Sequence, residues 1–153
     1  MEPKHIHKSH NVTLLLYHIV LVAKYRRMVF SDAVDKTVKD ICLEIEKRYE
    51  IKFLEIWSDK NHIHLVVQSV PTYSPKQIVQ TIKSIVARQV FKINPEVKRQ
   101  LRGGEFWTDW YYVNTVWWYT TVDAVIKYVQ HQWGKDYQSI HRKLPVPQSL
   151  FDV

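Results

Sequence analysis

Apolar residues along the chain switch between the spacing of strands and the spacing of helices. Thr13–Lys24 is rich in leucine, valine, isoleucine and tyrosine, which is typical of a buried strand. Apolar residues then recur three or four positions apart, which predicts an amphipathic helix that starts at the capping residue Ser31 and ends near Glu50. Its apolar positions are Val34, Val38, Ile41, Cys42, Ile45 and Tyr49.

The next segment predicts a β-hairpin followed by a second helix. Ile51–Trp57 and His62–Gln68 have strand composition, and the Ser-Asp-Lys-Asn sequence between them favours a tight turn. Ser74-Pro75 combines a capping residue with a proline suited to the first helical turn, so a helix is expected from there to about Phe91. Its apolar stripe is Ile78, Ile82, Ile85 and Val86.

The last third of the chain adds a strand and a third helix. Asn94-Pro95 breaks the helical pattern, Gly103-Gly104 indicates a loop, Trp110–Val116 predicts a fourth strand, and a helix is expected from about Thr120 to Trp133. The order β-α-β-β-α-β predicts an α+β protein with the ferredoxin-like split βαβ arrangement and a C-terminal helix. Both crossover helices would then cover one face of a four-stranded antiparallel sheet. We expect a single domain over residues 1–153, with irregular tails at 1–11 and 138–153.

Composition excludes several classes of protein. The only cysteine, Cys42, excludes an intrachain disulfide and a thiolate metal cluster, and suits a reducing cytoplasm. The longest apolar run, Leu14–Ala23, is about half of what a membrane helix needs, so no membrane association is expected. No secretion signal is recognisable at the N-terminus, and a cytoplasmic location is therefore expected.

Charge and aromatic content favour a polyanionic partner. The formal net charge is +7, and six tryptophans, nine tyrosines and five phenylalanines supply rings that could fill a core or stack on unpaired bases. Six basic residues in predicted loops are candidates for DNA phosphates, although each could equally be a solvated loop residue. They are Lys24, Arg26, Arg27, Lys98, Arg99 and Arg102.

The sequence His62-Ile63-His64 begins the third predicted strand. Side chains alternate along a strand, so both histidines point to one face while Ile63 points to the other. Leu65 and Val67 share the face of Ile63, which suits the helix-covered side and leaves the histidines on the open side. Two imidazoles at this spacing can hold one divalent cation, or can simply be a surface pair.

The third predicted helix carries a phenol and an amide on one face. Tyr128 lies off the apolar stripe of that helix, and Gln132 follows four residues later on the same side. If this helix packs on the open face of the sheet, Gln132 could complete a metal site with His62 and His64, beside Tyr128. His131 and His141 are rival third ligands, and the same pattern also fits an ordinary amphipathic helix with no site.

These motifs, in this order, resemble the small HUH-type insertion-sequence transposases that use a single tyrosine. The metal motif of that family corresponds to His62-Ile63-His64, and its Tyr-x-x-x-Gln motif to Tyr128–Gln132. Further similar segments are the first strand Tyr17–Val20 with the basic turn Lys24–Arg27, the helix start Tyr73-Ser74-Pro75, and the segment from Phe106-Trp107 through Tyr111–Val116. The resemblance covers the chain from about Tyr17 to Gln132.

The resemblance implies a transposase, that is, an HUH single-strand endonuclease and strand transferase. Tyr128 would be the catalytic nucleophile, and His62, His64 and Gln132 would hold Mg²⁺ or Mn²⁺, of which Mn²⁺ suits imidazole ligands better. The enzyme would cleave and rejoin single-stranded DNA at insertion-element ends through a 5′-phosphotyrosine, with no nucleotide cofactor. Its partners would be DNA hairpins and a second copy of itself, in a homodimer. Trp117-Trp118 stand where the family carries flexible glycines.

Three other functions remain open from the sequence. The chain could be a domesticated HUH endonuclease that cuts repeats without mobilising an element. It could be a non-catalytic nucleic-acid-binding ferredoxin-like module that uses aromatic rings on the open sheet face. It could also be a metal-dependent hydrolase in which water replaces the tyrosine as nucleophile.

Overall fold

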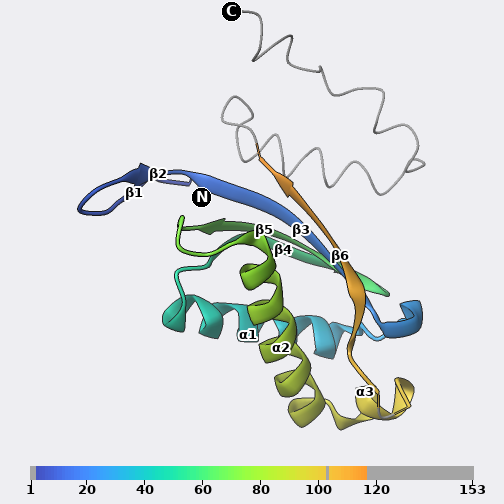
Figure 1. Ribbon diagram of the computed structural model, residues 1–153. Helices are drawn as coiled ribbons and strands as arrows, with labels where there is room; N and C mark the ends of the chain where they lie inside the picture. Colours follow the sequence, from blue (N-terminus) through green and yellow to red (C-terminus); the bar gives the residue numbers. More distant parts are fainter. Residues whose placement is uncertain (1–2, 103, 117–153) are drawn as a thin grey trace, which may run out of the picture. The chain divides into compact units, whose positions relative to one another are not determined.

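The computed structural model describes residues 3–102 and 104–116 (Figure 1). By its internal contacts the chain divides into two units, residues 1–119 and 120–153, and every described residue belongs to the first. The expected third helix and the expected tail at 138–153 therefore lie outside the described residues. No helix in the described ranges is long and apolar enough to cross a bilayer.

A four-stranded antiparallel sheet forms the centre of the described unit. Its strands are β3 (Leu15–Ala23), β4 (Lys52–Asp59), β5 (His62–Ser69) and β6 (Trp107–Thr115), in the spatial order β4-β5-β3-β6. The middle strands β3 and β5 pair so that Ile19 lies opposite Leu65. This order confirms the expected α+β, ferredoxin-like arrangement.

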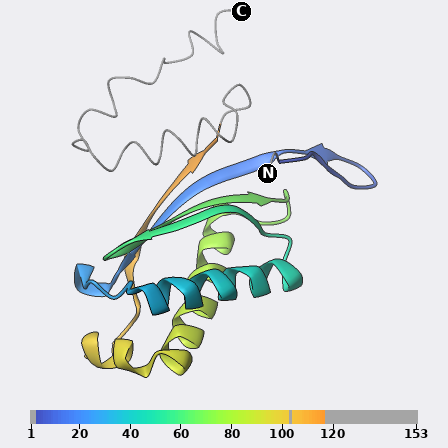
Figure 2. The same ribbon diagram turned by 180° about the vertical axis from the view of Figure 1, so that it is seen from behind.

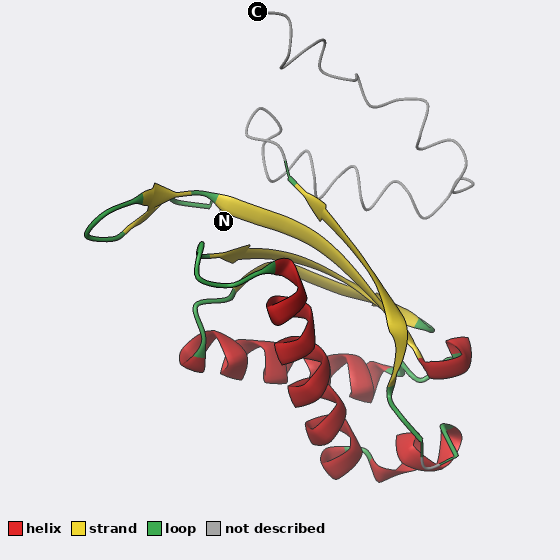
Figure 3. Ribbon diagram, viewed as in Figure 1, coloured by secondary structure: helices red, strands yellow, loops and turns green. Residues whose placement is uncertain are grey.

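Two long helices cover one face of this sheet. They are α1 (Asp32–Arg48) and α2 (Pro75–Ile93), and both lie on the same side of the strands (Figure 3). The view from behind shows the same arrangement (Figure 2). The Ser31 hydroxyl accepts a hydrogen bond from the Val34 N–H at 3.3 Å, and Ser74 forms a reciprocal capping box with Gln77. Both helices therefore start where the sequence predicts, since each cap satisfies N–H groups that lack a partner within the helix.

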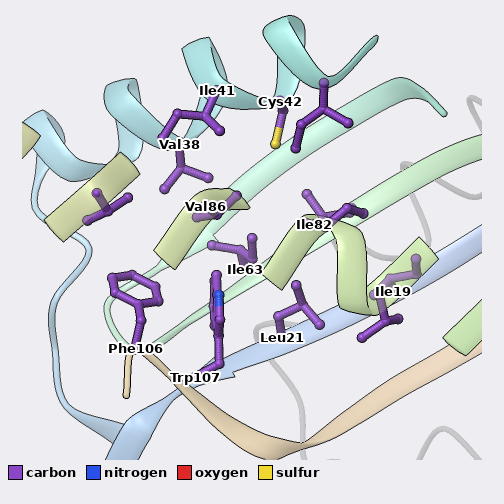
Figure 4. Packing of buried hydrophobic residues seen from close by; sticks show 14 of the residues in the cluster. Ile19, Leu21, Val38, Ile41, Cys42, Ile63, Ile82, Val86, Phe106 and Trp107 are labelled. Atoms are coloured by element: carbon purple, nitrogen blue, oxygen red, sulfur yellow. The ribbon is translucent and has the colours of Figure 1, made fainter. Parts of the chain in front are cut away.

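The core fills the space between the helices and the sheet (Figure 4). Ile63 and Leu65 of β5 are fully buried there, as are Ile19 and Leu21 of β3. Burying one such side chain contributes roughly 1.5–3 kcal/mol relative to leaving it exposed. The inward side chains of β5 are the ones that the alternation predicts, so the register of the strand follows from its own apolar pattern.

The N-terminal segment differs from the expected irregular tail over residues 1–11. β1 (Ile6–His7) and β2 (Val12–Thr13) form a short hairpin, with the Lys8 N–H donating to the Asn11 carbonyl at 2.9 Å. The Gln68 side chain also donates to the Lys4 carbonyl at 2.7 Å. Strands of two residues are too short to show an alternating pattern, so only their backbone pairing reveals them.

The segment between α2 and β6 also differs from the expected loop. α3 (Pro95–Gln100) is a short helix that begins at the predicted helix breaker, because a proline in the first turn gives up no helical hydrogen bond. Val97 and Leu101 are each only 1% exposed and anchor the segment in the core. β6 begins three residues earlier than predicted, and its first residue, Trp107, is buried and donates its indole N–H to the Lys83 carbonyl.

Candidate active site

The open face of the sheet, meaning the face turned away from α1 and α2, carries both predicted histidine ligands. Because the neighbouring Ile63 points into the core, His62 and His64 point to the opposite side, as the sequence predicts. His64 is only 7% exposed and His62 is half-buried. Trp57 of β4, which pairs with His64 across the strands, stacks on its ring with the centres 4.7 Å apart and the planes at 11°. The imidazole of His64 is thus held rigidly.

The separation of the two imidazoles fits a shared ion. Their ring centres are 5.2 Å apart and their planes meet at 63°. An imidazole nitrogen ligates at about 2.1 Å, which places two rings on one ion roughly 4.5–5.3 Å apart when the ligand angle is about 90–110°. In residues 3–102 and 104–116, no group of three His, Cys, Asp or Glu side chains is arranged to hold a metal. The two histidines therefore fit as part of a ligand set.

A third histidine, His18 on β3, belongs to the same cluster and was not predicted. Its Nε2 lies 2.9 Å from Nδ1 of His64, and the planes of the two rings differ by 16°. Tyr112 of β6 meets the edge of the His18 ring at 5.8 Å. The alternation of β3 puts His18 on the open face, but its partner follows only from the pairing of β3 with β5, in which Val20 lies opposite His64.

All three imidazoles favour the neutral form. Burial lowers the pKa of His64 to about 2, and the charges of His18 and His62 act in the same direction. Burial also lowers the pKa of His18 to about 4. The pKa of His62 is lowered chiefly by burial and further by Arg26, against the opposing effect of Asp59. A neutral imidazole keeps the lone pair that a metal ligand requires.

The predicted DNA-contacting residues separate into two groups. Arg26 and Arg27 follow β3 in and after the turn η1 (Lys24–Arg26), and together with Arg102 they line a hollow of about 650 Å³. Tyr25 and Met28 also line this hollow and are 68% and 71% exposed. Arg26 lies near enough to His62 to affect its pKa. Three of the six basic candidates therefore gather in one concave surface.

The other three basic candidates lie outside the hollow's lining. Lys24 forms an ion pair with Glu105 at 2.8 Å, and this hydrogen bond raises the pKa of the lysine. Lys98 is on α3, with its ammonium group 5.9 Å from the centre of the Phe91 ring, and Arg99 follows it on the same helix. The predicted residues Tyr128 and Gln132, the rival ligands His131 and His141, and Trp117-Trp118 are outside the described residues.

Comparison with known proteins places the chain among transposases. Residues 11–132 match the family described as "Transposase IS200 like". The chain belongs to the IS200-like transposase family. The matched range includes His62-Ile63-His64 and ends at Gln132, so the three proposed ligands and the candidate nucleophile fall inside it.

Individual IS200-like relatives agree with this assignment. The ISDra2 transposase TnpA of Deinococcus radiodurans is 29% identical over 122 residues, which cover 80% of this chain and 86% of the relative. The transposase for insertion sequence element IS200 of Salmonella typhimurium is 28% identical over 135 residues, with 88% of each protein covered.

Solved structures show the same fold. A crystal structure from Deinococcus radiodurans R1, described as a candidate transposase, has a TM-score of 0.68 at 27% identity and covers 83% of this chain and 97% of its own. A REP-associated tyrosine transposase bound to a REP hairpin has a TM-score of 0.52 at 10% identity, covering 90% of this chain and 83% of its own. The second likeness concerns the fold alone.

Proposed function

We propose that this transposase cleaves and rejoins single-stranded DNA at the ends of an insertion element, through a 5′-phosphotyrosine formed by Tyr128. His62, His64 and Gln132 would hold the divalent ion, Mg²⁺ or Mn²⁺. The observation that carries the proposal is the pair of imidazoles, His64 buried and His62 half-buried, whose lowered pKa values favour the neutral form and whose separation suits a shared ion, in a chain of the IS200-like family. Gln132 supplies the further ligand in this proposal.

The proposed reaction is a transesterification at one phosphodiester. The phenol oxygen of Tyr128 attacks the scissile phosphorus, the bond from phosphorus to the 3′ oxygen breaks, and the proton lost by the phenol is balanced by the one that the 3′ oxygen gains. The products are a 5′-phosphotyrosine and a free 3′-hydroxyl. A bound ion would neutralise charge on the phosphate and align it with the phenol, whose ordinary pKa of about 10 calls for activation. Attack by a 3′-hydroxyl reverses the step without a nucleotide cofactor.

The proposed DNA partner is a hairpin with a single-stranded flank, held by a homodimer. The hollow lined by Arg26, Arg27 and Arg102 supports this, because clustered guanidinium groups bind backbone phosphates. The exposed ring of Tyr25 in the same hollow suits stacking on an unpaired base. The tyrosine transposase whose structure was solved with a bound REP hairpin is a protein of the same fold that binds such a DNA.

A labelled single-stranded hairpin incubated with the protein and Mn²⁺ tests the proposal. Wild-type protein should form a protein–DNA adduct that survives denaturation, and Tyr128→Phe should bind the DNA without forming the adduct. Tyr49→Phe is the matched control, since Tyr49 is the C-cap residue of α1, on the helix-covered side. Binding without cleavage by wild-type protein would instead indicate a non-catalytic module.

Two further outcomes distinguish a hydrolase from a domesticated endonuclease. Cleavage that persists in Tyr128→Phe and leaves no adduct would indicate a hydrolase that uses water. Adduct formation and cleavage without rejoining of a donor and a target strand would indicate a domesticated endonuclease.

Strand joining by mixed dimers, one protomer carrying Tyr128→Phe and the other His64→Ala, would show that a helix and a sheet from different protomers can form one site.

A further inference from the structure

Both candidate ligand histidines engage a neighbour through the same ring nitrogen. Nδ1 of His64 faces Nε2 of His18 at 2.9 Å, and Nδ1 of His62 is hydrogen-bonded to the side-chain oxygen of Asn61. The amide oxygen can only accept, so Nδ1 of His62 carries the proton in that bond. Its lone pair is then on Nε2.

The contact between His18 and His64 is a directed hydrogen bond rather than a ring stack. An imidazole nitrogen lies about 1.1 Å from its ring centre, so a 5.2 Å separation of the centres with 2.9 Å between the nitrogens means that the rings point at each other edge to edge. Their planes differ by only 16°, which keeps the N–H and the accepting lone pair nearly in line. Such a bond fixes the orientation of each ring and holds one proton between the two nitrogens.

Packing prevents His18 from turning away. It is 9% exposed and meets Tyr112 of the neighbouring strand edge on, at 5.8 Å. The indole of Trp57 stacks on the face of the His64 ring and has its centre 6.2 Å from that of His18, so it packs beside both imidazoles. The shared proton can therefore be on His64 or on His18, but the rings cannot separate without repacking the open face.

We propose that His18 and Asn61 are positioning residues that hold His64 and His62 in the Nδ1–H tautomer, so that both rings present Nε2 to the same divalent ion. The inference rests on the metal site of the proposed function. If His18 donated the proton instead, Nε2 of His64 would carry a hydrogen and could not ligate. Ligand histidines commonly use their second ring nitrogen in this way, and loss of the partner typically costs 10–100-fold in metal affinity.

The tautomers are measured directly by long-range ¹H–¹⁵N correlation spectra of histidine-labelled, metal-free protein at neutral pH. We expect His62 and His64 in the Nδ1–H form, with their signals assigned from His62→Gln and His64→Gln. His18→Gln should preserve the tautomer of His64, because its amide oxygen can accept at the position of the imidazole Nε2. His18→Asn, which is too short to reach, should lose it. An Nε2–H form of His64 in the wild type, or identical spectra for the Gln and Asn variants, overturns the proposal.

Mn²⁺ titration followed by electron paramagnetic resonance gives the second measurement, on the full chain without DNA. His18→Asn and Asn61→Ala should each weaken binding 10–100-fold, while His18→Gln and Asn61→Asp should stay within a few-fold of wild type. Val20→Ala is the matched control, because Val20 lies opposite His64 in the pairing of β3 with β5 and offers no hydrogen bond. Circular dichroism confirms that each variant is folded.

The two measurements distinguish failure of this inference from failure of the proposed function. If the wild type binds Mn²⁺ and His18→Asn binds it equally well, the positioning role is wrong and the metal site stands. If the wild type binds no Mn²⁺, the metal site of the proposed function is wrong, and the assignment of the two positioning residues falls with it.

Discussion

Replacing Ile63 by alanine should lower the stability of the fold without removing a candidate metal ligand. Ile63 lies between the two candidate ligands on β5, is 0% exposed, and packs in the core between the sheet and the helices (Figure 4). Truncating a buried isoleucine to alanine costs about 2–5 kcal/mol, and the high end applies where the surroundings cannot collapse. Ile63 is held between paired strands and two helices, so we expect about 3–4 kcal/mol.

The assay is urea denaturation of wild type, Ile63→Ala and His62→Ala, combined with Mn²⁺ titration of each folded protein. Ile63→Ala should lower the free energy of unfolding by the stated amount and leave Mn²⁺ affinity within a few-fold. His62→Ala should abolish Mn²⁺ binding at little cost in stability, because its half-buried ring points away from the core. A loss of less than about 1 kcal/mol for Ile63→Ala would refute the assignment of faces on β5, since a one-residue slip exchanges them.

Three further predictions test the rest of the structure. Ser74→Ala removes the capping box of α2 and should lower the free energy of unfolding by about 1 kcal/mol, whereas Ser84→Ala, inside the same helix, should leave it nearly unchanged in thermal or urea denaturation. Arg27→Gln should weaken binding of single-stranded DNA in fluorescence-anisotropy titrations and reduce the slope of log affinity against log salt concentration by about 0.7. The control Arg48→Gln, at the end of α1, should leave this slope unchanged. Burial raises the pKa of Cys42 to about 12, so little thiolate exists at mildly alkaline pH. The native protein should therefore resist a thiol reagent that labels the denatured protein at once. Rapid labelling of the native protein would contradict the burial of this thiol.

Features encoded within one segment were predictable from the sequence. The alternation of β5 placed His62 and His64 on one face because the apolar residues between and after them had to be buried. The starts of both long helices followed from Ser31 and Ser74, whose hydroxyls satisfy N–H groups of their own helices. The fold class then followed from the order of the elements alone.

Features that depend on how segments pair, rather than on the pattern within one segment, were not predictable. The contact of His18 with His64 joins residues 46 positions apart and requires the register of β3 against β5. The hairpin of β1 and β2 is defined by backbone pairing of only two residues a strand, which leaves no periodic signal. The gathering of Arg102 with Arg26 and Arg27 likewise depends on where α3 ends relative to η1.

The antiparallel pairing of β3 with β5 also explains why basic residues and the candidate histidine ligands lie close together. In such a pair the end of one strand lies beside the start of the other, so the turn after Ala23 is placed next to His62. Two backbone hydrogen bonds hold this junction: the Ala23 N–H donates to the Asn61 carbonyl at 2.9 Å, and the Phe30 N–H donates to the Lys60 carbonyl at 3.1 Å. Burial is the main cause of the lowered pKa of His62, and the guanidinium of Arg26 adds to it against the opposing effect of Asp59. In the proposed function the same guanidinium would meet a DNA phosphate at this end of the sheet. One strand pairing thus places the basic turn beside the candidate metal ligand His62.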